Sequence, residues 1–407
     1  MSITAAGTNR QSMAALLQFA WDADVFTAND AIPVVGLTRS TTIDALDRLI
    51  ELGLVAEEPN AREVGDYRRG RPARRFRFRT DAAVVVGVDA GHAHLGVEVA
   101  DLAGATLARH AVELNPAIRE TGYRREQTAA AVDVTLGRAG RARADVVTVC
   151  LGVPAPVDSE GRSPHHAQGF WELMNPGMRD LFSEWAPIVR VENDAALAAV
   201  AERRVGAAVG CDDFVALLAG RRFGAGVVVG GQLLRGANGG VGEMTPLNQL
   251  AGVMSPDGLG DWLTGSVRRA IGSGEIPAGH PLSLLDPEEL TGRDVLAHAD
   301  DPLLAGVFER VAAAIARIIG LLGSMYDPEV VVLCGAIAAG IGPVLPRAQE
   351  LLAAEMDLPA PRLVASALGG EVVVAGAVAA AIESAQEQIL DLVTSGAFAV
   401  RGPSIVS

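Results

Sequence analysis

Val191-Glu-Asn-Asp-Ala195 opens the stretch that decides the fold of this chain, and Arg235-Gly-Ala-Asn-Gly-Gly-Val-Gly-Glu-Met244 closes it. The residues between them predict a helix, an apolar strand and a hairpin that turns at Gly230-Gly231. Because Asn193 and Asp194 come where an apolar strand gives way to a helix, we expect both side chains in the crevice at the carboxyl end of a sheet. Crevices of this kind bind small molecules in α/β folds.

The spaced combination of these motifs resembles the ROK family, which groups bacterial sugar kinases with sugar-responsive repressors. The resemblance covers residues 81 to about 385 and implies an α/β, actin-like ATPase fold of two lobes. It implies a first lobe over residues 81–200, closed by a C-terminal helix at about residues 373–395, and a second lobe over residues 201–372. In the family's kinases, the Asp of Asn-Asp takes a proton from the sugar hydroxyl, and Asp194 holds that position.

The composition is that of a globular protein with two or three domains. The chain has 407 residues, of which 49% are hydrophobic and 20% are charged, as in folded domains. Three widely spaced cysteines provide neither a disulfide framework nor a metal site, and no internal repeat is evident. Because neither a secretory signal nor an apolar span of bilayer length is found, we expect a soluble, cytoplasmic protein without a membrane partner.

The charge of the chain is unevenly distributed. The net charge is −15, and every basic residue is an arginine. Residues 61–80 nevertheless contain 8 Arg and 2 acidic residues. A short basic segment on an acidic body predicts that one region alone contacts nucleic acid.

Residues 1–80 predict a winged helix-turn-helix domain. Three amphipathic helices are expected, over Ser12 to Ala20, between Thr27 and Gly36, and from Thr38 to just before Gly53. Two strands follow, and the second, Arg75-Phe-Arg-Phe-Arg79, alternates so that both phenylalanines face inward. Since Pro33 falls inside the second helix and removes a hydrogen bond, we expect that helix to be short or bent.

Two groups of residues in this domain are predicted to contact a double-stranded DNA operator. Residues at the start of the third helix would reach base edges or phosphates in the major groove: Arg39, Ser40, Thr41 and Thr42. The loop between the strands adds arginines that would lie along phosphates or enter the minor groove: Arg68, Arg69 and Arg71. The ROK resemblance agrees, because its repressors carry an N-terminal winged helix with a Gly-Arg-Pro wing. A small helical bundle with a solvated arginine linker is the competing interpretation.

Three motifs depart from the pattern of the family's kinases. The first hairpin reads Asp89-Ala-Gly-His-Ala-His94 instead of Asp-x-Gly-Gly-Thr, and the phosphate loop Gly-Thr-Gly-x-Gly is replaced by Gly220-Arg-Arg-Phe-Gly224. Pro246 replaces a His that contacts sugar and zinc in the family, and the cysteines of its zinc knuckle are missing. We therefore expect no phosphoryl transfer, no bound metal and no cofactor, with Asp194 as a vestigial base.

The leading interpretation is a transcriptional regulator, expected to be a repressor, with a catalytically degenerate kinase-like domain. Asn193, Asp194 and Glu243 would hydrogen-bond the hydroxyls of a small-molecule effector, a sugar or sugar derivative. Closure of the lobes would change the spacing of the DNA-binding heads in a homodimer or homotetramer. Two alternatives remain open: an ATP-dependent sugar kinase with an accessory N-terminal domain, and a regulator that binds no ligand.

Overall fold

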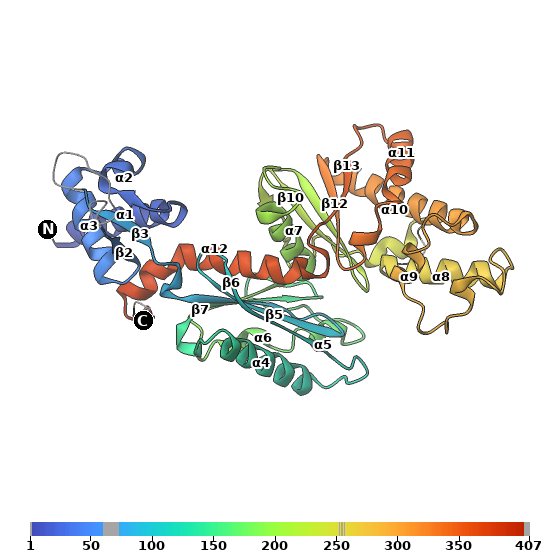
Figure 1. Cartoon of the computed structure of the whole chain (residues 1–407), viewed down its shortest axis with the longest axis horizontal. Helices are drawn as coiled ribbons and strands as arrows, with labels where there is room; N and C mark the ends of the chain where they lie inside the picture. The colour runs from blue at the N-terminus through green and yellow to red at the C-terminus, as the bar shows by residue number, and fades with distance from the viewer. Residues whose placement is uncertain (1, 60–72, 252, 254, 256, 403–407) are drawn as a thin grey trace.

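The N-terminal part of the computed structural model is a head made of helices and a small sheet (Figure 1). The structure describes residues 2–59, 73–251, 253, 255 and 257–402. Within the described part, the strands of the head pair antiparallel in the order β1-β3-β2. The elements of the head are α1 (Ser2–Asp22), β1 (Phe26–Thr27), α2 (Ala28–Val35), α3 (Arg39–Glu51), β2 (Val55–Glu58) and β3 (Arg75–Phe78).

Local hydrogen bonds set the limits of the head helices where the sequence predicts them. The Asp30 carboxylate accepts hydrogen bonds from both the N–H and the hydroxyl of Thr27, at 2.8 Å each, and so caps α2. α2 has eight residues and contains Pro33, so the expectation of a short helix is confirmed. Thr38 caps α3 by accepting a hydrogen bond from the Thr41 N–H. α1 is longer than expected and begins at Ser2.

Two five-stranded sheets with the same strand order form most of the remaining chain. In each sheet the first three strands in sequence are antiparallel neighbours, and the last two run parallel to the first. The first sheet has the order β6-β5-β4-β7-β8 and the second β11-β10-β9-β12-β13. The chain therefore contains a structural repeat that its sequence does not reveal. The strands are β4 (Val84–Asp89), β5 (His94–Asp101), β6 (Thr106–Glu113), β7 (Val146–Val153), β8 (Ile188–Asn193), β9 (Phe214–Ala219), β10 (Phe223–Val229), β11 (Gln232–Leu233), β12 (Val330–Cys334) and β13 (Arg362–Ala365).

Each sheet has helices on its outer face, and each pair of layers encloses its own apolar core. The first sheet is covered by α4 (Thr121–Arg138), α5 (Phe170–Met174) and α6 (Met178–Phe182). The second lobe carries α8 (Leu259–Gly272), α9 (Gly292–Leu296), α10 (Ala305–Tyr326) and α11 (Leu345–Glu355). None of the helices in the described part of the chain is both long and apolar enough to cross a membrane.

Two helices lie between the sheets and pack against each other: α7 (Asp194–Val205) and α12 (Val372–Thr394). α7 follows the last strand of the first sheet but packs on β9 and β10 of the second sheet. α12 follows the last strand of the second sheet but packs on β4 and β7 of the first, as the resemblance implied for a closing helix. This exchange joins the two lobes. Gly376 permits it, because a Cβ atom at this position would lie only 1.9 Å from the Leu197 carbonyl oxygen.

The far end of α12 reaches the head, as Figure 1 shows. Arg10 of α1 pairs with Asp391 of α12, with 2.8 Å between Nε and Oδ1. Beyond the helix, Phe398 is buried in the same apolar core as the head residues, and the Arg401 N–H donates to the Ala82 carbonyl. A single helix therefore connects the junction of the lobes to the head.

Candidate functional site

Asn193 and Asp194 lie where β8 ends and α7 begins, as the sequence predicts. The Asn193 Oδ1 atom accepts hydrogen bonds from the N–H groups of Ala195 and Ala196, at 2.9 and 3.1 Å. Its Nδ2 atom donates to the Ala155 carbonyl at 3.2 Å. The Asn193 side chain therefore caps the helix and anchors the loop after β7, a structural role that the sequence analysis missed. Only one amide hydrogen remains for a ligand.

Asp194 presents a carboxyl group with an unusual protonation equilibrium. Its Oδ1 atom accepts a hydrogen bond from the Ala195 N–H at 2.8 Å, whereas Oδ2 has no hydrogen-bond partner among the described residues. Burial, followed by the negative charge of Asp89 and that of Glu243, raises the pKa of Asp194 to about 7. At neutral pH this carboxyl group can therefore both donate and accept a hydrogen bond.

Asp89 adds a second carboxylate beside Asp194. It is buried at the end of β4, and its Oδ2 atom lies 2.9 Å from the His94 Nε2 atom. The hydrogen bond to Asp89 is the main cause that raises the pKa of His94. The sequence indicates Asp89 only as part of a degenerate phosphate hairpin. The strand pattern could have placed Asp89 beside Asp194. β4 and β8 both run parallel to β7, so their carboxyl ends lie at the same end of the sheet.

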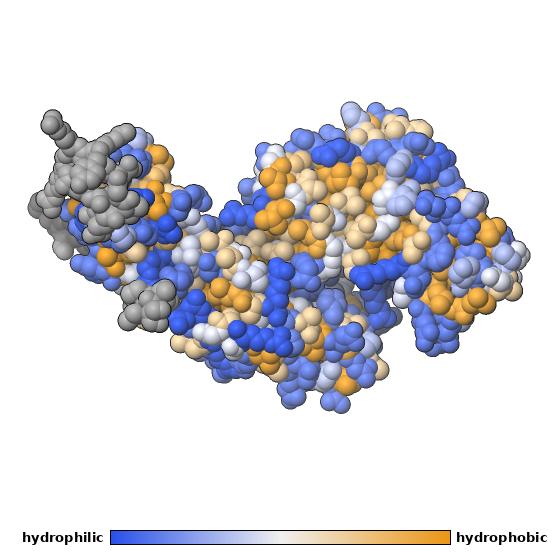
Figure 2. All heavy atoms as spheres, viewed as in Figure 1, coloured by the Kyte–Doolittle hydropathy of each residue, from blue (hydrophilic) through white to orange (hydrophobic). Residues whose placement is uncertain are grey.

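Glu243 approaches the same place from the second lobe. It forms a β-bridge with Gly224 of β10, and a Cβ atom at Gly224 would lie 3.1 Å from that of Ala195. Its carboxylate is exposed and accepts a hydrogen bond from the Thr245 hydroxyl at 3.1 Å. The three residues predicted to bind a sugar are thus brought to the junction of the lobes. Figure 2 shows the molecule hollowed between the first lobe and the part of the second that carries α8 and α9.

The two turns that would hold phosphate in a kinase contact each other across the lobes. Arg221, between β9 and β10, places Nη1 2.8 Å from Nδ1 of His92, in the turn after β4. Both residues that make this contact depart from the small residues of the kinase pattern. Their side chains therefore occupy the space between the two turns, through which a phosphate group would have to enter.

The residues predicted to contact DNA differ in accessibility. Arg39 and Ser40 are exposed, and Arg39 donates to the Asn29 side chain at 2.8 Å. Thr41 is half-buried. The expectation for Thr42 was wrong: Thr42 is fully buried, and its hydroxyl donates to the Thr38 carbonyl within the helix. Arg68, Arg69 and Arg71 lie outside the described residues.

Arginines of the β3 strand region bind acidic residues of the head itself. Arg74 pairs with Asp47 of α3 at 2.7 Å and with Glu57 of β2 at 2.8 Å. Arg77 pairs with Glu58 at 3.2 Å. Phe76 and Phe78 are buried, so the predicted alternation is confirmed. Arg74 therefore joins the hairpin to α3, whereas Arg77 pairs with β2 within the hairpin.

Within the ranges that the structure describes, no group of three or more His, Cys, Asp or Glu side chains is arranged to hold a metal ion. Cys150, Cys211 and Cys334 are free thiols. Burial raises the pKa of Cys150 to about 12.

Two lobes of the same strand order, joined by exchanged helices over a polar junction, define the actin-like kinase class of folds. Residues 85–249 match the ROK family model. These residues therefore form a ROK family domain.

Three known proteins are similar to this chain. A glucokinase from Halalkalibacterium halodurans is 27% identical over 275 residues, which cover 62% of this chain and 80% of that protein. The solved structure of a ROK family transcriptional regulator, described as a homologue of the E. coli MLC protein, has a TM-score of 0.73 and 18% identity, covering 96% of this chain and 99% of its own. A ROK family glucokinase from Streptomyces griseus, solved with glucose and AMPPNP, has a TM-score of 0.61 and 22% identity, covering 74% of this chain and 100% of its own.

Proposed function

We propose that this protein is a DNA-binding transcriptional regulator, acting as a repressor, whose two lobes bind a sugar or sugar derivative. The observation that carries the proposal is the head, in which exposed Arg39 and Ser40 begin a helix that follows a short helix and a turn. The similar structure of a transcriptional regulator matches 96% of this chain, whereas the glucokinase structure matches 74%. A winged helix that binds DNA accounts for the part of the chain that the regulator structure matches and the glucokinase structure does not.

In this proposal the first turn of α3 enters the major groove of the operator. Arg39 forms no ion pair with an acidic residue in the described part of the chain, and its hydrogen bond to Asn29 leaves guanidinium donors for a base edge or phosphate. The paired arginines of the β3 region support the head, and the loop with Arg68, Arg69 and Arg71 supplies the phosphate contacts. Paired half-sites in the operator would require a homodimer or homotetramer.

The sugar would bind at the junction of the lobes. Asp194 offers an unpaired Oδ2 atom, Glu243 an exposed carboxylate, and Asn193 one amide hydrogen. Hydroxyl groups are suited to this set because they donate to the carboxylates and accept from the amide. α12 would transmit lobe closure to the head, since it packs on α7 at one end and pairs with α1 at the other.

A gel-shift titration on DNA upstream of the protein's own gene tests the DNA-binding proposal. We expect specific binding that weakens as salt rises, because arginines displace counterions from phosphates. Arg39→Ala should reduce specific affinity by roughly tenfold or more, corresponding to about 1–3 kcal/mol for a base contact. Arg48→Ala is the matched control on α3, because Arg48 pairs with Glu51. Equal binding by wild type and Arg39→Ala would contradict the placement of α3.

A sugar kinase is the second candidate. The raised pKa of Asp194 favours it, because a general base works best with a pKa near the operating pH, and the glucokinase relative supports it. The Arg221–His92 contact favours a chain without phosphoryl transfer, since it fills the approach between the two phosphate turns. A coupled assay across hexoses decides between them. Turnover that Asp194→Asn abolishes would establish the kinase, and calorimetry on the same sugars would separate a sensing regulator from one that binds no ligand.

A further inference from the structure

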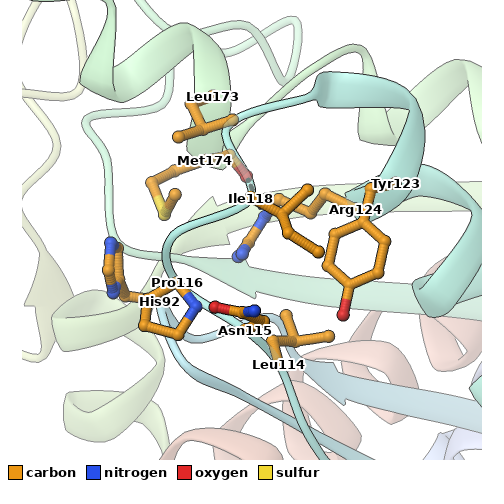
Figure 3. Close-up of a pocket in the computed structure, with 9 residues that line it drawn as sticks. All are labelled: His92, Leu114, Asn115, Pro116, Ile118, Tyr123, Arg124, Leu173 and Met174. Atoms are coloured by element: carbon orange, nitrogen blue, oxygen red, sulfur yellow. Dashed lines mark hydrogen bonds between the residues drawn. The ribbon is translucent and has the colours of Figure 1, made fainter.

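A small pocket lies on the first lobe, beside the turn after β4. Its walls come from this turn, the segment before α4, the first turn of α4 and the end of α5. In Figure 3 the guanidinium group of Arg124 points into the space between His92 and Asn115. The pocket is small and opens to solvent. It therefore suits one small chemical group.

Arg124 is a buried cation, and the negative charge of Asp89 offsets only part of the effect of its burial. Only 4% of its surface is exposed, and it forms no ion pair within the described residues. Its Nε atom donates to the Met174 carbonyl at 3.2 Å, and its Nη2 atom donates to the carbonyls of Ala90 and Gly91. Burial lowers the pKa of Arg124 to about 10. A charge in this situation is costly unless an anion accompanies it.

The third nitrogen of the guanidinium group is not used by the fold. An arginine that only clamped the chain would direct all its donors at carbonyls, but Nη1 of Arg124 has no hydrogen-bond partner in the described part of the chain. Arg124 lines the pocket, so this nitrogen is the donor left for a ligand. Arginine binds oxyanions through paired N–H groups of this kind.

The surroundings of Arg124 are positively charged and rich in donors. Arg221, Arg124 and Arg119 all lower the pKa of His92, after the effect of its burial. The Asn115 Oδ1 atom already accepts a hydrogen bond from the Ala117 N–H at 3.0 Å, which leaves the Nδ2 group for an acceptor. Positive potential and free donors at one small pocket both favour an anion.

We infer that this pocket binds a small oxyanion, a phosphate or carboxylate group, with Arg124 as its charge partner and His92 and Asn115 at its rim. The pocket is adjacent to Asp89, but none of the residues predicted to bind the sugar lines it. The inference therefore does not depend on the proposed function.

The inference is tested by measuring how inorganic phosphate binds to the full chain. Calorimetry gives the affinity, and the melting temperature at constant ionic strength gives the stabilisation. We expect phosphate and sulfate to raise the Tm of the wild type, and an equivalent concentration of chloride to have a smaller effect. Asn115→Asp is the decisive variant, because Asn115 is exposed and the new carboxylate would supply the missing charge partner from within the chain. This variant should melt higher without phosphate and bind phosphate at least tenfold more weakly.

Two further variants distinguish phosphate binding in this pocket from a general effect of charge on stability. Arg124→Gln should lose phosphate binding. If the loss of its carbonyl contacts unfolds Arg124→Gln, the Asn115→Asp variant still decides the test. Arg125→Gln is the matched control, since Arg125 also donates to carbonyls, those of Pro176 and Gly177, but does not line the pocket. A sugar phosphate that binds more tightly than inorganic phosphate would identify the ligand as phosphorylated, and acetate would identify a carboxylate. No response of the wild type, or an unchanged response of Asn115→Asp, would overturn the inference.

Discussion

Gly376→Ala is expected to destabilise the protein by about 3 kcal/mol or more, the upper part of the range for overpacking a tight core. A Cβ atom at this position would lie 1.9 Å from the carbonyl oxygen of Leu197. Because that atom belongs to the backbone of α7, no side-chain rotation can relieve the clash. The crossing of α7 and α12 would have to widen, and the packing of both lobes depends on that crossing.

The melting temperature and the urea midpoint measure this effect. Gly320→Ala is the matched control, because Gly320 also lies inside a long helix, α10, and its Cβ atom would meet only the Leu352 side chain at an ordinary 3.6 Å. Alanine there should be neutral or stabilising by up to about 1 kcal/mol, since it favours the helix over glycine. If the two variants melted alike, the helices would not cross as closely as the structure has them.

Asp194→Asn is expected to remove a large part of the pH dependence of stability. The pKa of Asp194 is raised from its ordinary 3.8 to about 7 in the folded protein. Between these values the folded state holds a proton that the unfolded state has released, so the stability falls as pH rises through this window. The loss amounts to at most about 4 kcal/mol, at about 1.4 kcal/mol for each pKa unit. Asparagine cannot ionise, and the variant should therefore be the more stable protein above pH 7.

Urea unfolding at several pH values between about 4 and 8 provides the measurement. The raised pKa of His94 acts in the same direction, since its stabilising charge is lost as pH rises. The difference between wild type and Asp194→Asn isolates the contribution of Asp194 from that of His94. Asp300→Asn, at an exposed position, is the control for removing a charge. Parallel pH profiles for wild type and Asp194→Asn would show that Asp194 ionises freely in the folded state.

Features that depend on neighbours in the chain could be predicted from the sequence. The Thr27–Asp30 cap, the buried phenylalanines of β3 and the Gly230-Gly231 hairpin all form where expected. Each depends on hydrogen bonds or alternation within a few residues. The three residues predicted to bind a sugar lie at the junction of the lobes, because α7 begins where β8 ends and Glu243 forms a bridge with Gly224 of β10.

Positions whose role depends on distant segments were predicted less well. Thr42 was expected at a DNA surface because of its place in the helix start, yet it faces the inside of the head. Asn193 was expected to bind sugar, but two helix N–H groups and the Ala155 carbonyl use most of its capacity. Arg74 belongs to the basic segment predicted to contact nucleic acid, but it pairs with Asp47 and Glu57 of the head.

The sequence by itself determined the order of helices and strands, the caps that limit them and the motifs that resemble those of the ROK family. Periodicity and capping are local, so they can be read without a structure. Only the tertiary structure decided that the two sheets share one strand order, that α7 and α12 are exchanged between lobes, and that burial, Asp89 and Glu243 raise the pKa of Asp194. These features arise from packing between segments far apart in the chain, and the pKa depends on burial that such packing creates.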